Sequence, residues 1–209
     1  MKKFITVALS TLLILGTVGC AQRNTNTTGT NGNTTGTNDN TTEQSNAYYN
    51  SYTGLYNESI GTLTGYDMYT DVNTANDAFK NKEYPGNEQY LNDVKAAYKD
   101  SREKIQSFVN GLKNDVKTDD AELKQMNEDL IAEGEKLIKD IDAKIAKLDK
   151  ITENDYNKTQ NEFIQLVNDT VNTGENVASG FSEMLRNMDV RLGINRDTIN
   201  KNNTNNTTK

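Results

Sequence analysis

The side chains that most often carry chemistry in proteins are nearly absent from this 209-residue chain. It has no histidine and a single cysteine, Cys20. Without histidine there is no imidazole base to activate a serine and no imidazole ligand for zinc, iron or copper. A single cysteine forms neither an intramolecular disulfide nor a cysteine metal cluster. The sequence also has no Gly-x-Ser-x-Gly, phosphate-binding loop or dinucleotide fingerprint, so the common signatures of enzymes are missing.

Paired carboxylates are the enzyme design that this composition still allows. Aspartate and glutamate are common, with 30 in the chain. On the helices predicted below they are interleaved with lysines at exposed positions, which indicates a solvated charged face. Such pairs are Asp119 and Asp120, Glu133 and Glu135, and Asp140 and Asp142. We therefore predict no catalytic residue and no enzymatic activity.

A calcium site would need neither histidine nor cysteine, because calcium prefers oxygen ligands. The segment Asp71-Val72-Asn73-Thr74-Ala75 starts like a calcium-binding loop. However, Ala75 occupies a ligand position, no glycine follows and the final glutamate is missing. The sequence predicts no metal site and no cofactor.

Tyrosines crowd the amino-terminal part of the chain. Aromatic rings with a polar tip are enriched at interfaces and can stack on sugars or peptides. Six of them form a candidate ligand or partner surface: Tyr48, Tyr49, Tyr52, Tyr56, Tyr66 and Tyr69. The alternative is a core role, in which the rings are buried in the seams of a thin helical bundle and the hydroxyls reach water.

Cys20 ends a segment with the layout of a secretory signal. Lys2 and Lys3 give it a charged start, residues 4–15 are apolar, and small residues precede the cysteine. The apolar run is too short to span a bilayer comfortably. Thr17-Val18-Gly19-Cys20 resembles the lipobox of bacterial lipoprotein precursors, although that family usually has leucine where this chain has Thr17.

The resemblance covers about the first twenty residues and implies a lipid anchor on Cys20. In that family the thiol receives a diacylglycerol, the signal is cleaved before the cysteine and the new amino terminus is often acylated, for example with palmitate. Two or three acyl chains give stable anchoring, whereas one binds a bilayer only marginally. We expect the chain on the extracytoplasmic face of the cell membrane. The alternatives are a signal cleaved elsewhere and an uncleaved amino-terminal anchor.

Composition indicates which classes of partner to expect and which kind of organism the protein comes from. The formal net charge is −7, which argues against nucleic acid as a partner and against electrostatic adhesion to anionic lipid. The membrane contact is therefore expected through Cys20 alone. The abundance of Asn and Thr is typical of an AT-rich genome, and we associate it with a Gram-positive bacterium.

Apolar periodicity predicts an all-α fold. Apolar residues recur at steps of three and four, which is the pattern of a helix with one buried face. Long helices are expected from about 47 to 64, from 87, from about 120 to 148 and from 153 to 191, with a minor helix near 71–80. Short turns between the last three predict an up-and-down antiparallel bundle of three to four long helices. The heptads are too irregular to decide whether these helices pair as a coiled coil.

Helix ends and glycines add detail to this prediction. Capping boxes are expected at Asp119 with Glu122 and at Thr152 with Asp155. Gly134 and Gly174 fall on apolar seams, and we expect their two helices to approach closely there.

The domain prediction follows from these patterns. Residues 1–19 are a lipoprotein signal peptide, 20–46 a disordered Asn/Thr/Gly-rich tether, 47–195 the helical bundle and 196–209 a disordered Asn/Thr-rich tail. The expected function is non-enzymatic, through contacts with an unknown envelope protein or polymer. The alternative is a ligand-binding lipoprotein with a tyrosine-lined pocket near the first helix.

Overall fold

A computed structural model describes residues 39–63, 72–172 and 177–196 of the chain. Within these ranges all regular structure is helical, so the predicted all-α class is confirmed. Cys20, Tyr66, Tyr69 and Gly174 lie outside the described residues. The elements in chain order are α1 (Asp39–Glu58), η2 (Ile60–Thr62), α2 (Val72–Ala78), α3 (Asn87–Asn114), α4 (Ala121–Leu148), η4 (Glu153–Asn157), α5 (Gln160–Val171) and α6 (Val177–Leu192).

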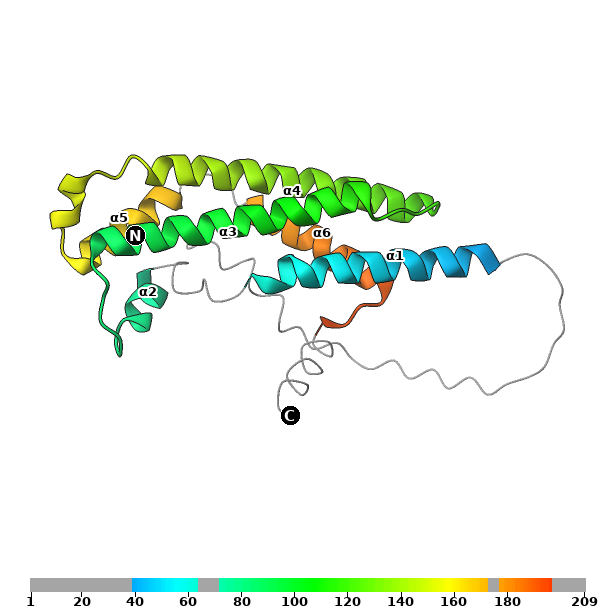
Figure 1. The fold of residues 1–209 in the computed structure, drawn as a ribbon, viewed down its shortest axis with the longest axis horizontal. Helices are drawn as coiled ribbons and strands as arrows, with labels where there is room; N and C mark the ends of the chain where they lie inside the picture. Colours follow the sequence, from blue (N-terminus) through cyan, green and yellow to red (C-terminus); the bar gives the residue numbers. More distant parts are fainter. Residues whose placement is uncertain (1–38, 64–71, 173–176, 197–209) are drawn as a thin grey trace, which may run out of the picture.

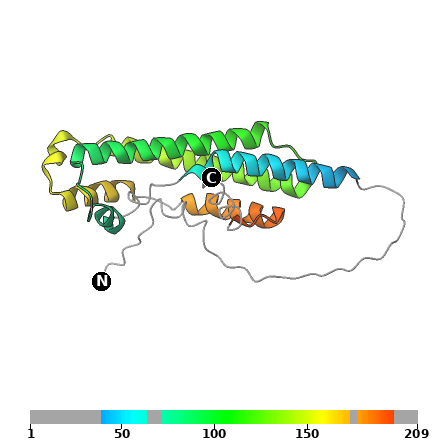
Figure 2. The same ribbon diagram turned by 60° about the horizontal axis from the view of Figure 1, so that its bottom comes forward.

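Helices α3 and α4, of 28 residues each, form the central antiparallel pair. Helix α6 packs along α4, and α1 packs against α3 (Figures 1 and 2). The short helix α2 packs against α5 near the end of the pair where α3 starts and α4 ends. Each long helix buries one apolar face, as its periodicity predicts.

The single long helix expected over 153–191 is wrong. The structure has η4, α5 and α6 in that range, and residues 173–176 between the last two lie outside the description. The predicted capping box at Thr152 and Asp155 is present, but it starts only the five-residue η4. A second capping box at Thr159 and Glu162 then starts α5. This second box has the same sequence signature as the first, but apolar periodicity does not detect a helix cap.

Two helix starts also differ from the predicted ones. Helix α1 begins at Asp39, inside the segment predicted as tether. The predicted start is too late because the apolar pattern becomes visible only at Tyr48, which is buried. Asp120, and not Asp119, caps α4, since its side chain accepts hydrogen bonds from the backbone N–H groups of Glu122 (2.9 Å) and Leu123 (3.0 Å). The sequence offers two adjacent aspartates here, and its pattern does not choose between them.

The core is tightly packed where α3, α4 and α6 meet at Gly134. A Cβ atom on Gly134 would lie 2.5 Å from Cγ2 of Val109 and 3.2 Å from Cε2 of Phe181. The ring of Phe181 in turn makes an edge contact with that of Phe108, at 6.2 Å between centroids. Gly134 thus allows a close approach, and the neighbours it meets belong to α3 and α6. The predicted approach between Gly134 and Gly174 is not tested, because Gly174 lies outside the described residues.

Candidate functional site

Three of the six candidate tyrosines form one buried stripe along α1. Tyr48, Tyr52 and Tyr56 are spaced four residues apart, so they lie on the same face of the helix. Their exposed fractions are 1%, 0% and 6%. The rings of Tyr48 and Tyr52 are stacked at 6.4 Å between centroids, and Tyr52 and Tyr56 both make edge contacts with Phe108 of α3. The stripe is therefore part of the core.

The hydroxyl groups of this stripe have partners inside the protein. The Tyr48 hydroxyl donates to Oδ1 of Asn127 at 3.2 Å, and the Tyr52 hydroxyl donates to Oδ1 of Asp189 at 3.2 Å. These contacts join α1 to α4 and α6. They favour the core interpretation over the ligand-surface interpretation for these tyrosines, because both ring and hydroxyl are already occupied. Tyr49 is only half-buried and lies off the stripe.

A buried ion pair covers the stripe, and sequence reasoning missed it. Arg196 forms hydrogen bonds through Nε and Nη2 to both carboxylate oxygens of Asp189, and each side chain is 10% exposed. Nη2 of Arg196 also lies 3.4 Å from the Tyr52 hydroxyl, and its Cζ lies 3.2 Å from the centroid of the Tyr56 ring. The guanidinium is thus held by one carboxylate and one aromatic face. We call Tyr52, Tyr56, Asp189 and Arg196 the arginine clamp.

The turn at Gly193 brings Arg196 back onto α6. Gly193 has a φ of 67°, which favours glycine. Its N–H donates to the Val190 carbonyl at 3.2 Å, and the N–H of Ile194 donates to the Asp189 carbonyl at 2.8 Å. This pair of bonds is a Schellman motif. The predicted tail from residue 196 therefore starts too early, because Arg196 belongs to the packed domain.

Burial dominates the electrostatics of the clamp. It raises the pKa of the Asp189 carboxyl, and the Arg196 guanidinium opposes this by favouring the charged carboxylate. Burial also raises the pKa of Tyr52 and Tyr56. The charged and hydrogen-bonding groups of the arginine clamp bind one another, so we assign the clamp to stability and not to catalysis.

Alkaline pH should unfold the protein together with ionisation of its buried tyrosines. Burial raises the pKa of Tyr48, Tyr52 and Tyr98, and it raises that of Tyr84 to about 12. Since these folded-state values exceed the unfolded value of about 10, stability is unaffected below about pH 10 and falls as the pH rises above it. Tyrosinate absorbance and far-ultraviolet circular dichroism, recorded over the same titration, should change together. Full tyrosine ionisation near pH 10 with helicity retained would contradict the burial of these side chains.

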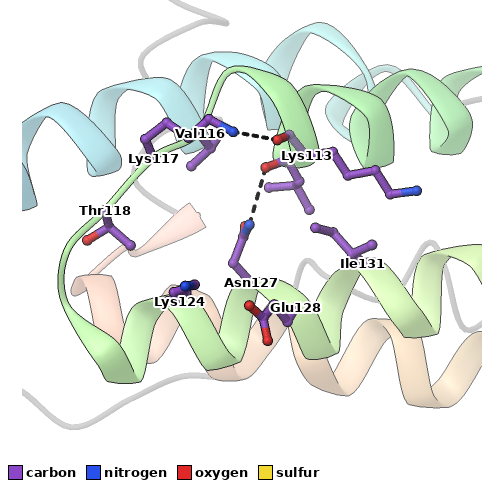
Figure 3. A pocket seen from close by; sticks show the side chains of 9 residues that line it. Lys113, Val116, Lys117, Thr118, Lys124, Asn127, Glu128 and Ile131 are labelled. Carbon is purple, nitrogen blue, oxygen red and sulfur yellow. Dashed lines mark hydrogen bonds between the residues drawn. The ribbon is translucent and has the colours of Figure 1, made fainter.

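A pocket of about 270 Å³ lies at the hairpin between the end of α3 and the start of α4 (Figure 3). We call it the hairpin pocket. Three lysines lie around it, and Asn127 fixes its inner wall by donating from Nδ2 to the Leu112 carbonyl at 3.2 Å. Its lining is Leu112, Lys113, Val116, Lys117, Thr118, Lys124, Asn127, Glu128 and Ile131. None of these residues was a candidate from the sequence, where isolated lysines look like any solvated face.

Residues 39–63, 72–172 and 177–196 contain no group of three or more His, Cys, Asp or Glu placed to hold a metal ion. In the same ranges, no helix is both long enough and apolar enough to cross a bilayer.

No protein-family model, curated protein or solved structure matches this chain.

Proposed function

We propose that this chain is a membrane-anchored, extracytoplasmic lipoprotein without enzymatic activity, which makes protein or cell-envelope contacts through a helical domain. The observation that carries the proposal is the position of Cys20 at the end of a secretory-type segment, immediately after Thr17-Val18-Gly19. The described helices all follow this cysteine in the chain. Lipid on Cys20 would therefore leave the whole domain outside the membrane.

The proposed architecture is an up-and-down bundle built on α3 and α4, with a disordered tether before it and a disordered tail after it. The antiparallel packing of α3 and α4, with α6 along α4 and α1 along α3, supports this arrangement. The Asn/Thr/Gly-rich composition of residues 20–38 supports the tether, because such a segment buries too little apolar surface to fold.

The contacts of this domain are proposed to be polar. Among the described residues, Val190 is the one large hydrophobic side chain that is exposed, at 76%. A partner that relied on a broad apolar surface would require a contiguous patch. Ion pairs instead occupy the outer faces of the helices, for example Arg102 with Asp142 and Lys95 with Asp149. Polar contacts would give specificity and fast association more than high affinity.

Substitution of Cys20 tests the anchor. Cells producing the wild-type chain or Cys20→Ala would be labelled with an alkyne fatty acid, fractionated and probed for the protein. We expect the label and the membrane fraction to contain wild-type protein only, because the thiol is the acceptor of the diacylglycerol. Mass spectrometry of the mature protein should place lipid on an amino-terminal Cys20.

The matched control is Ser10→Ala, a small change within the same leader that keeps the cysteine. It should be labelled and anchored like wild type. Fatty-acid label on the Cys20→Ala protein, or an unmodified Cys20 in the mature wild-type chain, would refute the anchor. Protease treatment of intact cells or spheroplasts then tests the side of the membrane, and a protected domain would refute the extracytoplasmic location.

The second candidate function is ligand binding, and the hairpin pocket is the observation that favours it. The pocket that the sequence placed among amino-terminal tyrosines is not supported for Tyr48, Tyr52 and Tyr56, since their side chains are buried in the core. The hairpin pocket is open to solvent, and its partly apolar lining carries three exposed lysines, Lys113, Lys117 and Lys124.

A further inference from the structure

The lysines of the hairpin pocket form a locally positive surface on an acidic protein. The lining carries Lys113, Lys117 and Lys124 against one acid, Glu128, while the whole chain has a formal charge of −7. A local excess of positive charge favours an anionic ligand such as a phosphate group. Lysine is a common phosphate-binding residue because its ammonium group acts as a mobile point charge.

Two of these lysines have ammonium groups that form no ion pair with an acidic side chain of the described residues. Lys113 forms an ion pair with Glu135 of α4. Lys117 instead donates to the backbone carbonyl of Lys113 at 2.6 Å and makes no salt bridge within the described part of the chain. The Lys124 side chain has neither a hydrogen bond nor an ion pair to another described residue. Figure 3 shows Lys117 on the α3 side of the pocket, with its ammonium group turned to the Lys113 carbonyl, and Lys124 on the α4 side.

The remaining lining sets the shape of the pocket. Asn127 is held on both sides, because it accepts a hydrogen bond from Tyr48 of α1 while one of its two Nδ2–H groups donates to the Leu112 carbonyl. Its amide therefore forms a fixed wall of the pocket. The Thr118 hydroxyl accepts from the Asp120 N–H at 3.1 Å, so its own proton remains available to donate. Leu112, Val116 and Ile131 supply an apolar strip beside the lysines.

From this arrangement we infer that the hairpin pocket binds a phosphate group carried on a small organic substituent, with Lys117, Lys124 and the Thr118 hydroxyl as its donors. The volume of about 270 Å³ is just below the range of about 300–1,000 Å³ that is typical of pockets for drug-sized ligands. It suits a phosphate ester with a few further heavy atoms. The apolar strip would cover the carbon atoms next to the ester.

The place of the pocket in the domain points to two sources of such a phosphate. The α3–α4 hairpin lies at the same end of the domain as the start of α1, the helix that follows the anchor segment (Figures 1 and 2). A phosphate ester at that end could be a soluble molecule or a lipid head group. The inference itself does not depend on lipidation of Cys20, because every residue it uses lies in α3, α4 or the turn between them.

The test uses the full chain purified in uncharged detergent micelles. It would be titrated with glycerol phosphate at constant ionic strength, and binding would be followed by calorimetry and by the amide chemical shifts of Thr118 and Lys124. An open, lysine-based site gives modest affinity, so we expect dissociation constants on the order of millimolar and a marked weakening with added salt. The double variant Lys117→Gln/Lys124→Gln should bind at least about tenfold more weakly, because it lacks both charged donors.

The matched control removes the same number of charges elsewhere. Lys82 and Lys99 are exposed and lie far from the hairpin, and Lys82→Gln/Lys99→Gln should change the affinity less than about twofold. All lysines in both variants are exposed, so both proteins should keep the wild-type melting temperature. Equal loss of binding in the two double variants would overturn the inference, because it would show a response to net charge alone. Shifts induced equally by sodium chloride would overturn it as well.

A second arm identifies the source. The same proteins would be mixed with micelles doped with phosphatidylglycerol. Shifts at Thr118 and Lys124 that are lost in Lys117→Gln/Lys124→Gln would support the pocket and assign it to a lipid head group. Lysine-dependent binding of glycerol phosphate without a response to the lipid would support it and assign it to a soluble phosphate ester. Absence of lysine-dependent binding in both arms would refute the site.

Discussion

Replacement of Arg196 by methionine is expected to lower the free energy of unfolding by about 3 kcal/mol, the lower end of the range for a broken buried ion pair. The loss arises because Asp189 stays behind. It belongs to α6 and is largely buried, so among the described residues its carboxylate keeps only the Tyr52 hydroxyl as a side-chain donor once the guanidinium is gone. Urea unfolding monitored by circular dichroism measures the change.

The pH dependence separates this mechanism from simple loss of packing. Arg196 lowers the pKa of Asp189 against the effect of burial, so removal of Arg196 raises the pKa of Asp189 further. A carboxyl whose folded-state pKa is raised above its unfolded value of about 3.9 costs stability as the pH rises through that interval. Arg196→Met should therefore regain part of its lost stability as the pH is lowered from about 7 toward the unfolded pKa of about 3.9. A loss that is the same throughout this range would contradict the unpaired carboxylate.

Two variants serve as controls for the clamp. Arg191→Met removes an exposed arginine of α6, which pairs with Asp120 and Glu122, and it should cost much less because water replaces its contacts. The double variant Asp189→Leu/Arg196→Met removes both buried charges and should recover most of the stability. A double variant that is less stable than Arg196→Met would refute the ion-pair argument.

Truncation of Phe181 to alanine is expected to destabilise the domain by about 3–5 kcal/mol. This ring is completely buried, contacts Phe108 and covers the place where Gly134 lacks a side chain. The cavity would open where α3, α4 and α6 meet, and three rigid helices cannot collapse to fill it. Thermal and urea unfolding measure the loss, which should appear as a lower denaturant midpoint with an unchanged slope.

Val190 provides the matched control for Phe181. It lies in the same helix but is 76% exposed, so Val190→Ala should change the unfolding free energy by less than about 0.5 kcal/mol. Similar losses in the two variants would show that α6 is not packed through Phe181, and they would contradict the described core.

The helices of this protein could be predicted where the apolar pattern is long and continuous. Helix α3 begins at Asn87, just after Pro85 and Gly86, as expected, and α4 ends at Leu148 near the expected turn. The prediction of one continuous helix over 153–191 is wrong for a physical reason. Apolar spacing continues from η4 through α5 into α6, but Thr159 and Glu162 make a new amino-terminal cap inside that pattern. Periodicity records which face is buried and not whether the backbone is continuous.

The sites were harder to predict than the helices. The tyrosine stripe was recognised, with a core role as its alternative, because its four-residue spacing is visible in sequence. Its partner Arg196 was not, because it reaches Tyr52 across 144 residues and stands in a segment that looks like tail. The hairpin pocket was missed for a similar reason. Lys117 and Lys124 line the same pocket only because a short turn reverses the chain between α3 and α4.

The division of the helices covering α3 and α4 has a consequence for cooperativity. At one end α2, η4 and α5 cover the central pair, while α1 and α6 cover it toward the other end. The described contacts between these two groups pass mainly through α3 and α4. Partial opening of α2 and α5 therefore leaves the arginine clamp in place. The end of the domain next to the proposed anchor can stay folded while the far end exchanges its amide protons with water.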